Sequence, residues 1–369
     1  MSSPEPFEIF LMSLPGHEEM LAAEARESGF GQVKTTPGGV TVVGGWPEVW
    51  RANLELRGTG RVLARIGSFR AFHLAQLDKR ARKFPWAETL RPDTPIKVET
   101  TCKRSKIYHA KAATQRIETA LKDNLGAEIS ADASLVLKAR IEDDLVTFSL
   151  DTSGEALHKR GHKQGVGKAP LRETMAAMFL RQMGYDGTQA VVDPMCGSGT
   201  ICIEAAEIAL GLKPGRSRSF AFETLASFDP DAWSTLRVTT PQADVSKQFF
   251  ASDRDDGAVR MAQKNAERAG VSELISFARQ GVSELQRPDT APGIVLVNPP
   301  YGARIGNRKL LFSVYGALGK TLAERFKGWR VGVITSDGGL AKSTGLGLKP
   351  AGPPVAHGGL KVSLFQGQC

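Results

Sequence analysis

Residues 190–200 read AVVDPMCGSGT, an apolar stretch that ends in Asp193 and runs directly into a glycine-rich turn. The residues that follow, ICIEAAEIAL, have the spacing of a helix. Gly197 and Gly199 allow a ligand to approach the backbone closely, and the first turn of the helix offers free N–H groups to an anion. The motif is not a full GxGxxG, because Cys202 takes the third glycine position, and no GK[ST] of a P-loop follows. It indicates either a nucleotide-binding turn or a purely structural one.

Strands and helices alternate on both sides of this motif. A helix, LRETMAAMFLRQM, is expected to open after Pro170 and to end at Gly184. The strands expected after it are AVVD, QFFASD, LISFAR, IVLVN, VGVIT and LKVSLF, with helices after Thr200, after Asp255 and around residues 310–326. This alternation predicts a doubly wound, mostly parallel α/β sheet of the Rossmann-like class.

The second expected strand, QFFASD, ends in Asp253. An acid at this place accepts hydrogen bonds from the ribose hydroxyls of a nucleoside ligand. Asp255 and Asp256 follow at the start of a helical pattern, so we expect Asp255 to be the helix N-cap. Because Asp253 comes after a glycine-rich turn, we interpret it as a ribose ligand and not as an ordinary loop acid.

The fourth expected strand delivers NPPYG, residues 298–302, to its carboxyl end. Pro299 and Pro300 stiffen the backbone and remove two N–H donors. The Asn298 side-chain oxygen and the Pro299 carbonyl are then acceptors, and Tyr301 supplies a ring. Two acceptors can hold the hydrogens of an exocyclic amine while the ring stacks on its base. We therefore predict catalytic roles for Asn298, Pro299, Pro300 and Tyr301; the alternative is a proline-stiffened turn.

The positive charge of the chain is concentrated. The formal net charge is +9, and residues 57–122 hold sixteen Lys and Arg against five Asp and Glu. Such a concentration suits a phosphate backbone, so a nucleic-acid partner is favoured over an incidental basic face. The N-terminal half otherwise reads as short strands and helices, including a strand over residues 61–69, a helix over 108–125 and a hairpin whose turn is Glu142-Asp143-Asp144.

Composition limits the remaining classes. The four cysteines form no CxxC pair and no histidines have zinc-ligand spacing, so no metal site is expected. No apolar run reaches the ~20 residues of a membrane helix, and the acidic N-terminal flank does not resemble a signal peptide. Free cysteines without an export signal favour the cytoplasm. The oligomeric state is not predicted.

These motifs carry a family resemblance. DPMCGSGT, FFASD and NPPYG resemble motifs of class I S-adenosylmethionine-dependent amino-methyltransferases. The segments ALHKRGHKQGVGKAPLRETMAA, LPGHEEMLAAEA, WRANLELRGTGRVLARIGSF, KFPW and TCKRSKIYHAKAATQRI are similar to bacterial 23S ribosomal RNA guanine-N2 methyltransferases that carry a THUMP domain. The resemblance covers nearly the whole chain. It implies an N-terminal α/β subdomain (1–45), an RNA-gripping THUMP-like domain (46–150), a linker (151–170) and a catalytic domain (171–369).

The resemblance also implies the cofactor site. S-adenosylmethionine would be bound by residues of the segment before the first strand, of the glycine-rich turn and of the following strand ends: Pro170, Leu171, Thr174, Asp193, Pro194, Gly197, Gly199, Thr200, Asp253 and Asn298. One departure is that Gly281 occupies the place where such enzymes put an acid for the adenine amino group. Ser283, Glu284 or a backbone carbonyl would have to replace it.

Other functions remain open from sequence. NPPY is shared with adenine-N6 methyltransferases, which act on RNA or DNA. A second alternative is an RNA-binding protein with an inactive methyltransferase domain, and a dehydrogenase is a third, which would have no use for NPPY. In the insertion between residues 211 and 246, basic and aromatic side chains indicate either a clamp for a displaced base or a cluster that packs the insertion onto the sheet: Arg216, Arg218, Phe220, Phe222 and Trp233.

Overall fold

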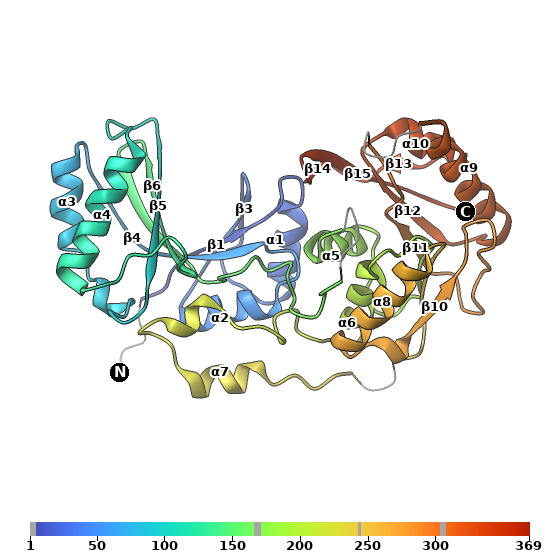
Figure 1. Ribbon diagram of the computed structural model, residues 1–369, viewed down its shortest axis with the longest axis horizontal. Coiled ribbons are helices and arrows are strands. Elements are labelled where there is room, and N and C mark those ends of the chain that lie inside the picture. Colours follow the sequence, from blue (N-terminus) through green and yellow to red (C-terminus); the bar gives the residue numbers. More distant parts are fainter. Residues whose placement is uncertain (1–4, 166–170, 243–244, 303–307) are drawn as a thin grey trace. The chain divides into compact units, whose positions relative to one another are not determined.

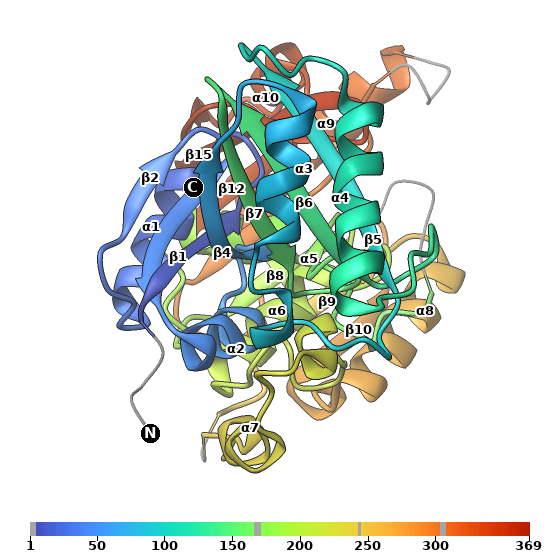
Figure 2. The ribbon, with the colours of Figure 1, turned by 90° about the vertical axis from the view of Figure 1, so that its left-hand side faces the viewer.

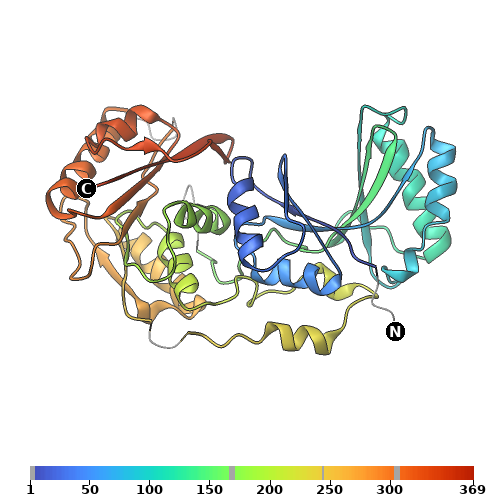
Figure 3. The ribbon, with the colours of Figure 1, turned by 180° about the vertical axis from the view of Figure 1, so that it is seen from behind.

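A computed structural model describes residues 5–165, 171–242, 245–302 and 308–369. Its contacts divide the chain into two compact units (Figures 1 and 3). Unit 1 holds Met1–Ser13, Ala22–Leu157 and Arg218–Val238, and unit 2 holds Leu14–Leu21, His158–Ser217 and Thr239–Cys369. Each unit is described by itself.

Unit 1 is built on one seven-stranded sheet with the order β2-β3-β1-β4-β7-β6-β5. All neighbours are antiparallel except β5 and β6. The strands are β1 (Phe7–Met12), β2 (Lys34–Thr36), β3 (Gly39–Gly44), β4 (Arg61–Arg70), β5 (Ile96–Lys103), β6 (Leu135–Glu142) and β7 (Leu145–Asp151). The long strand β4 pairs with β1 through its first residues and with β7 along most of its length, with a bulge between Arg65 and Gly67. The expected subdomain 1–45 and the expected domain 46–150 therefore share a sheet.

The helices of unit 1 are α1 (Glu18–Glu27, which crosses the division between the units), α2 (Trp46–Glu55), α3 (Leu74–Arg82), α4 (Ala110–Leu125) and α7 (Pro230–Arg237). Figure 2 shows α3 and α4 side by side in front of the strands β4 to β7. Histidine side chains cap both helices, since His73 Nδ1 accepts from Gln76 N and His109 Nδ1 accepts from Ala112 N. Only Leu77 and Ala81 of α3 are buried, which explains why its polar sequence gave no helical signal.

The insertion is a structural part of unit 1. Phe220, Phe222 and Trp233 are buried at 4%, 0% and 4% exposure, and Phe222 stacks on Trp50 of α2 with the ring centroids 6.2 Å apart. Figures 1 and 3 show the yellow helix α7 beside the blue helix α2. The clamp interpretation is wrong because these rings are not accessible to a base. The rings do form a packing cluster, as the alternative interpretation expected, but they pack within unit 1 and not on the sheet that carries the glycine-rich turn.

Unit 2 contains an eight-stranded sheet, β10-β9-β8-β11-β12-β15-β13, with β14 paired to β15. Pairing is parallel from β10 to β12, and β15 is antiparallel to β12, β13 and β14. The strands are β8 (Val191–Asp193), β9 (Phe249–Asp253), β10 (Ile275–Arg279), β11 (Ile294–Val297), β12 (Arg330–Thr335), β13 (Lys349–Pro350), β14 (Val355–His357) and β15 (Leu360–Gln368). The predicted Rossmann-like class is confirmed.

Helices cover both faces of this sheet (Figure 1). On one face, α5 (Glu173–Gln182), α6 (Thr200–Ala209) and α8 (Asp256–Ala269) enclose a core that includes Phe179, Ile201 and Phe249. On the other, α9 (Arg308–Arg325) and α10 (Gly338–Ser343) enclose a second core around Tyr315 and Trp329. No helix within the described ranges is both long and apolar enough to traverse a bilayer.

The contacts divide the chain differently from the expected domain boundaries, and Leu14–Leu21 groups with unit 2 although it lies inside the expected subdomain 1–45. The segment expected to be a linker is split between Leu157 and His158, and residues 218–238 group with unit 1 although they lie inside the expected catalytic domain. These differences depend on packing between segments far apart in sequence, which local patterns do not encode. The boundaries themselves stay a prediction.

Candidate active site

The strand order of unit 2 reverses at β8, with β9 on one side and β11 on the other. In open α/β sheets this reversal leaves a crevice at the carboxyl ends of the strands, where ligands bind. A pocket of about 1010 Å³ lies there. Its lining comes from the ends of β8, β9, β10 and β11, from α9, and from the β14–β15 hairpin: Arg172, Pro194, Met195, Asp253, Arg254, Asp255, Ala258, Gln280, Gly281, Val282, Ser283, Asn298, Pro299, Pro300, Tyr301, Leu310, Leu311, Ser313, Val314, Ala317, His357, Gly358 and Leu360.

The two glycines of the turn have different surroundings. Both have positive φ angles, +52° at Gly197 and +84° at Gly199. A Cβ at Gly197 would meet nothing within 4 Å, whereas one at Gly199 would lie 2.9 Å from Ala262 Cβ of α8. Gly197 thus leaves open space above the turn, as a ligand would need. Gly199 instead permits the close packing of α6 against α8.

Hydrogen bonds join the turn to the second strand. The Gly197 N–H donates to Asp253 Oδ2 at 3.1 Å, and the Asp255 N–H donates to Asp253 Oδ1 at 3.0 Å. Asp255 Oδ1 in turn accepts from Gly257 N and Ala258 N, which confirms it as the N-cap of α8. Asp253 is therefore held at the pocket wall with its carboxylate oriented by two backbone donors.

Asp193 lies behind this wall at 2% exposure, and its Oδ1 accepts from Met195 N at 3.2 Å. Burial raises its pKa to about 8; the Met195 N–H opposes this shift and the charge of Asp253 adds to it. At neutral pH most of the Asp193 carboxyl therefore stays protonated.

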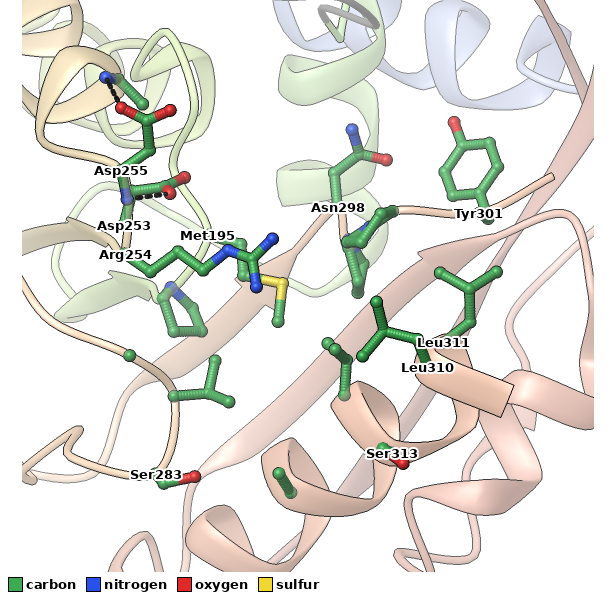
Figure 4. A pocket seen from close by; sticks show the side chains of 18 of the residues that line it. Met195, Asp253, Arg254, Asp255, Ser283, Asn298, Tyr301, Leu310, Leu311 and Ser313 are labelled. Atoms are coloured by element: carbon green, nitrogen blue, oxygen red, sulfur yellow. Dashed lines mark hydrogen bonds between the residues drawn. The ribbon is translucent and has the colours of Figure 1, made fainter. Parts of the chain in front are cut away.

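Asn298 to Tyr301 follow β11 and form the opposite wall (Figure 4). Asn298 Oδ1 is buried and has no hydrogen-bond partner among the described residues. Such an acceptor is costly unless a donor reaches it. Burial raises the pKa of Tyr301 to about 12, so its phenol stays neutral. Figure 4 also places Asp253, Arg254 and Asp255 across the pocket from Asn298.

At the end of the third strand, β10, no acidic side chain of the described residues lines the pocket, as the glycine at position 281 led us to expect. Gly281, Val282 and Ser283 line the pocket, while the Glu284 carboxylate accepts a hydrogen bond from Gly281 N at 2.9 Å. Glu284 does not line the pocket itself. Of the substitutes considered from sequence, Ser283 and the backbone of Gly281–Ser283 are therefore the groups that face a ligand.

Lys163 organises the segment before the first strand of unit 2. Its ammonium donates to the Leu171 carbonyl and to Thr200 Oγ1, both at 2.9 Å, and lies 3.3 Å from a Glu173 carboxylate oxygen. These contacts tie the start of α5 to the N-terminus of α6. Nearby, Arg160 and Glu204 form an ion pair with side chains 2% and 0% exposed. Within the expected linker, Arg160 and His162 are thus buried, at 2% and 3% exposure.

Only some of the predicted residues reach the pocket lining. Pro194, Asp253 and Asn298–Tyr301 line it, whereas six others do not: Leu171, Thr174, Asp193, Gly197, Gly199 and Thr200. Pro170 lies outside the described residues. Sequence reasoning missed Arg172, Arg254, the α9 residues and the hairpin residues His357, Gly358 and Leu360. The glycine pair after His357 is a turn signal that would have located the hairpin, but nothing local marks the α9 residues.

His357 adds a second buried polar atom to the pocket lining. Its Nδ1 has no hydrogen-bond partner within the described part of the chain. Burial lowers its pKa, and Arg172 and Lys163 lower it further, so the ring is neutral at pH 7. The same part of the chain contains no group of three or more His, Cys, Asp or Glu able to hold a metal ion.

The site fits a nucleoside-containing cofactor together with a planar substrate. Asp253 offers its carboxylate to ribose hydroxyls, the space above Gly197 is open, and Val282 supplies an apolar surface for a ring. Asn298 Oδ1, which has no partner among the described residues, is available to an N–H donor of the substrate. The volume is sufficient for both molecules, since ordinary ligand pockets are ≈ 300–1,000 Å³.

Comparisons with known proteins agree with this geometry. Residues 160–346 match the family described as the RMKL-like methyltransferase domain, and residues 8–63 match the RlmL ferredoxin-like domain. A candidate RNA methyltransferase of Synechocystis sp. is 31% identical over 95% of this chain and 94% of its own length. A protein of Syntrophotalea carbinolica named ribosomal RNA large subunit methyltransferase K/L is 34% identical over 92% of this chain. The chain spans 51% of that relative's length.

Solved structures show the same fold. A protein of Listeria monocytogenes described as a predicted N6-adenine-specific DNA methylase has a TM-score of 0.86 and 28% identity, covering 98% of this chain and 96% of that one. SMU.472, solved with S-adenosylhomocysteine (SAH), has a TM-score of 0.85 and 26% identity, covering 98% of both chains. TrmN of Thermus thermophilus, at 20% identity with a TM-score of 0.72 and covering 98% of this chain and 100% of its own, shares the fold.

Proposed function

The chain belongs to the family of RMKL-like methyltransferases, and from this premise we propose that it methylates the exocyclic N2 amino group of a guanine in 23S ribosomal RNA. S-adenosylmethionine is its cofactor and supplies an electrophilic methyl group when bound. The residues that would hold it are Asp253, the turn at Gly197, and the pocket surface at Gly281–Ser283.

The observation that carries this proposal is the buried, unpartnered Oδ1 of Asn298 at the pocket wall. A buried acceptor without a donor costs about 1–3 kcal/mol, so its position calls for an N–H from a ligand. An exocyclic amine supplies two such hydrogens. The amine is a weak nucleophile because its lone pair delocalises into the base, and acceptors that hold both hydrogens orient that pair.

The neighbouring residues complete this arrangement. Pro299 is buried and fixes the backbone beside Asn298, so that its carbonyl can serve as the second acceptor. Tyr301 stays neutral, which suits a ring that stacks on a base and not a group that removes a proton. Leu310, Leu311 and Val314 of α9 give the pocket an apolar side that limits water near the amine.

RNA is the favoured substrate because of unit 1. Sixteen of the Lys and Arg residues lie between positions 57 and 122, and a concentrated basic surface binds phosphate backbones. The named relatives act on ribosomal RNA of the large subunit or on RNA. We assign residues 46–150 to the RNA-gripping THUMP-like domain, with the enzyme acting in the cytoplasm. The pocket chemistry suits the amine of either purine. The choice of guanine therefore rests on the resemblance to guanine-N2 enzymes.

Adenine-N6 methylation is the second candidate. Its support is the description of the Listeria monocytogenes neighbour and the fact that adenine N6 is also an amine conjugated to a purine ring. The third candidate, an inactive domain that only binds RNA, is disfavoured because the Asn298–Tyr301 wall is intact and open to a ligand.

The test is to incubate the full chain with protein-free ribosomal RNA and methyl-labelled cofactor, digest the RNA to nucleosides and identify the labelled species. We expect N2-methylguanosine. Label in N6-methyladenosine would move the proposal to adenine, and label only with DNA would exclude RNA. No label in either nucleic acid, with cofactor binding intact by calorimetry, would leave the inactive alternative.

A further inference from the structure

Six of the seven exposed large hydrophobic side chains in the described chain gather in two places. Leu310, Phe312 and Leu360 lie on the elements that line the active-site pocket. Phe72, Tyr108 and Leu145 lie in unit 1 and are 40%, 83% and 39% exposed. Single exposed apolar side chains are common, whereas exposed ones that gather in one place mark interaction sites.

These three residues belong to three loops at one end of the unit 1 sheet, which we call the loop cluster: residues 71–73, 103–109 and 142–145. Hydrogen bonds join the loops directly. Lys106 N donates to Asp144 Oδ1 at 2.8 Å, Ala71 N donates to the Asp144 carbonyl at 3.0 Å, and Asp144 N donates to Ser105 Oγ at 3.0 Å. The neighbouring Ile107 is buried at 3% exposure and anchors the loop that presents Tyr108. Tyr108 is thus held outward by a fixed loop.

Backbone conformation supports a fixed geometry. Asp143 and Asp144 have φ angles of +51° and +62°, as a two-residue hairpin turn requires. Arg104 has a φ angle of +48°, which is uncommon for a long side chain. Its guanidinium pairs with Glu142 at 2.7 Å and with Asp143 at 3.1 Å. Such conformations persist where the surroundings hold them, and they cluster at functional sites.

The charges of the loop cluster complement an anion. Its acids are engaged within the cluster, Glu142 and Asp143 by Arg104 and Asp144 by the Lys106 backbone. Lys106 places its ammonium 5.0 Å from the centre of the Phe72 ring. Within the described residues, no carboxylate lies within 4 Å of the Arg70, Lys106 or Lys111 side-chain nitrogens. Arg70 donates to the Asp143 carbonyl at 3.3 Å. Cations beside exposed aromatic rings are the combination that binds unpaired nucleic acid.

We propose that the loop cluster binds an unpaired segment of the RNA substrate, with a base stacked on Tyr108 and the adjacent phosphates held by Lys106 and by the neighbouring Arg70 and Lys111. This inference rests on the proposed function. Unpaired RNA is required because a ring can stack only on a base whose face is free. The cluster would then recognise a single-stranded part of the RNA, while the pocket accepts the base that is methylated.

The test measures binding of the full chain to a short unpaired ribosomal RNA fragment and to a duplex of equal length. Tyr108→Ala should weaken binding to the unpaired fragment about five- to a hundred-fold, the effect of removing a stacking ring, and leave duplex binding unchanged. Lys106→Ala should weaken binding and lower the salt slope by about one. Tyr108→Phe, which keeps the ring, and Val238→Ala, at an exposed site outside the cluster, should match the wild type.

Cofactor binding by calorimetry monitors folding of every variant. Unchanged binding of Tyr108→Ala, or an equal loss on both RNAs, would overturn the inference while leaving the proposed function intact. A change in sedimenting mass in Tyr108→Ala would make the cluster a contact between copies of the chain and also overturn it. Failure of the wild type to bind any RNA would overturn both the inference and the proposed function.

Discussion

The pocket of unit 2 and the loop cluster of unit 1 hold their polar groups in different ways. In the pocket, Asn298 Oδ1 is a buried acceptor, and two backbone donors orient the Asp253 carboxylate. In the loop cluster, Tyr108 is exposed and the cations lie at the surface. A buried acceptor is satisfied only by a donor in one geometry. An exposed ring can stack on any base, and an exposed ammonium can pair with any phosphate. We therefore expect the pocket to decide which atom is methylated and the cluster to decide how strongly RNA is held.

Removal of the buried acceptor is expected to have the largest effect on this division. Asn298→Ala leaves the amine without the group that orients it, so the rate of methyl transfer should fall about 10²–10³-fold. RNA affinity should stay as in the wild type because the loop cluster is intact. Single-turnover transfer of labelled methyl groups and a parallel RNA titration measure the two quantities.

Asn298→Asp is the matched variant, since it keeps an acceptor oxygen at the same place and should retain part of the activity. Full activity in Asn298→Ala would show that Asn298 has only a structural role. A large loss of RNA affinity in that variant would contradict the division between the two regions.

Asp253→Ala should have the next largest effect, on cofactor affinity alone. Loss of a hydrogen bond to a charged acceptor costs about 1.5–3 kcal/mol, so S-adenosylmethionine should bind roughly ten- to a hundred-fold more weakly. Asp253 also accepts from Gly197 N and Asp255 N, and a structural role must be separated from a ribose contact. Calorimetry with S-adenosylhomocysteine and its 2′-deoxy form makes this separation.

The wild type should prefer the ligand with the full ribose, and Asp253→Ala should lose that preference. If the variant discriminates between the two ligands as well as the wild type does, Asp253 does not bind the ribose.

The smallest effect is expected from His17, which lies in the segment Leu14–Leu21 of unit 2, between two segments of unit 1. His17 packs edge-on against Phe179 with ring centroids 5.0 Å apart, and burial lowers its pKa from 6.5 to about 4. Below pH 6.5 the unfolded chain therefore binds a proton at His17, whereas the folded chain binds it only as the pH approaches about 4. This contribution to the free energy of unfolding is full at neutral pH and falls by about 2 kcal/mol between pH 7 and pH 5.

His17→Leu removes the titrating group, so its free energy of unfolding should fall less steeply over this range than that of the wild type. Hydrogen exchange of α5, measured against exchange of β6, would locate the difference in unit 2. Parallel pH dependences of the two proteins would show that burial of His17 does not shift its proton affinity.

The strand ends of unit 2 were predictable from sequence because each strand is a short apolar run closed by a polar residue. Asp193, Asp253 and Asn298 were found in this way, and the N-cap role of Asp255 followed from its position before a helical pattern. The hairpin that brings His357 and Leu360 to the pocket was missed because it depends on pairing between β14 and β15.

Sequence reasoning found the hairpin turn at residues 142–144 of the loop cluster, but it missed the rest of the cluster for a related physical reason. Tyr108 was placed at the start of an amphipathic helix, and its exposure depends on hydrogen bonds between loops from different parts of the chain. Likewise, Phe222 was considered as a base clamp because no local pattern shows that its partner is Trp50.

The strand β4 has a consequence for how this protein could be divided. The match to the ferredoxin-like domain ends at residue 63, within β4, whose residues Arg61–Ala64 pair with β1 while the strand also pairs with β7. A chain cut at that boundary would lose most of the strand and leave unpaired backbone groups along an open sheet edge, which invites aggregation. The expected subdomain 1–45 and the expected domain 46–150 would therefore be inherited, exchanged or transplanted together, as one hydrogen-bonded unit.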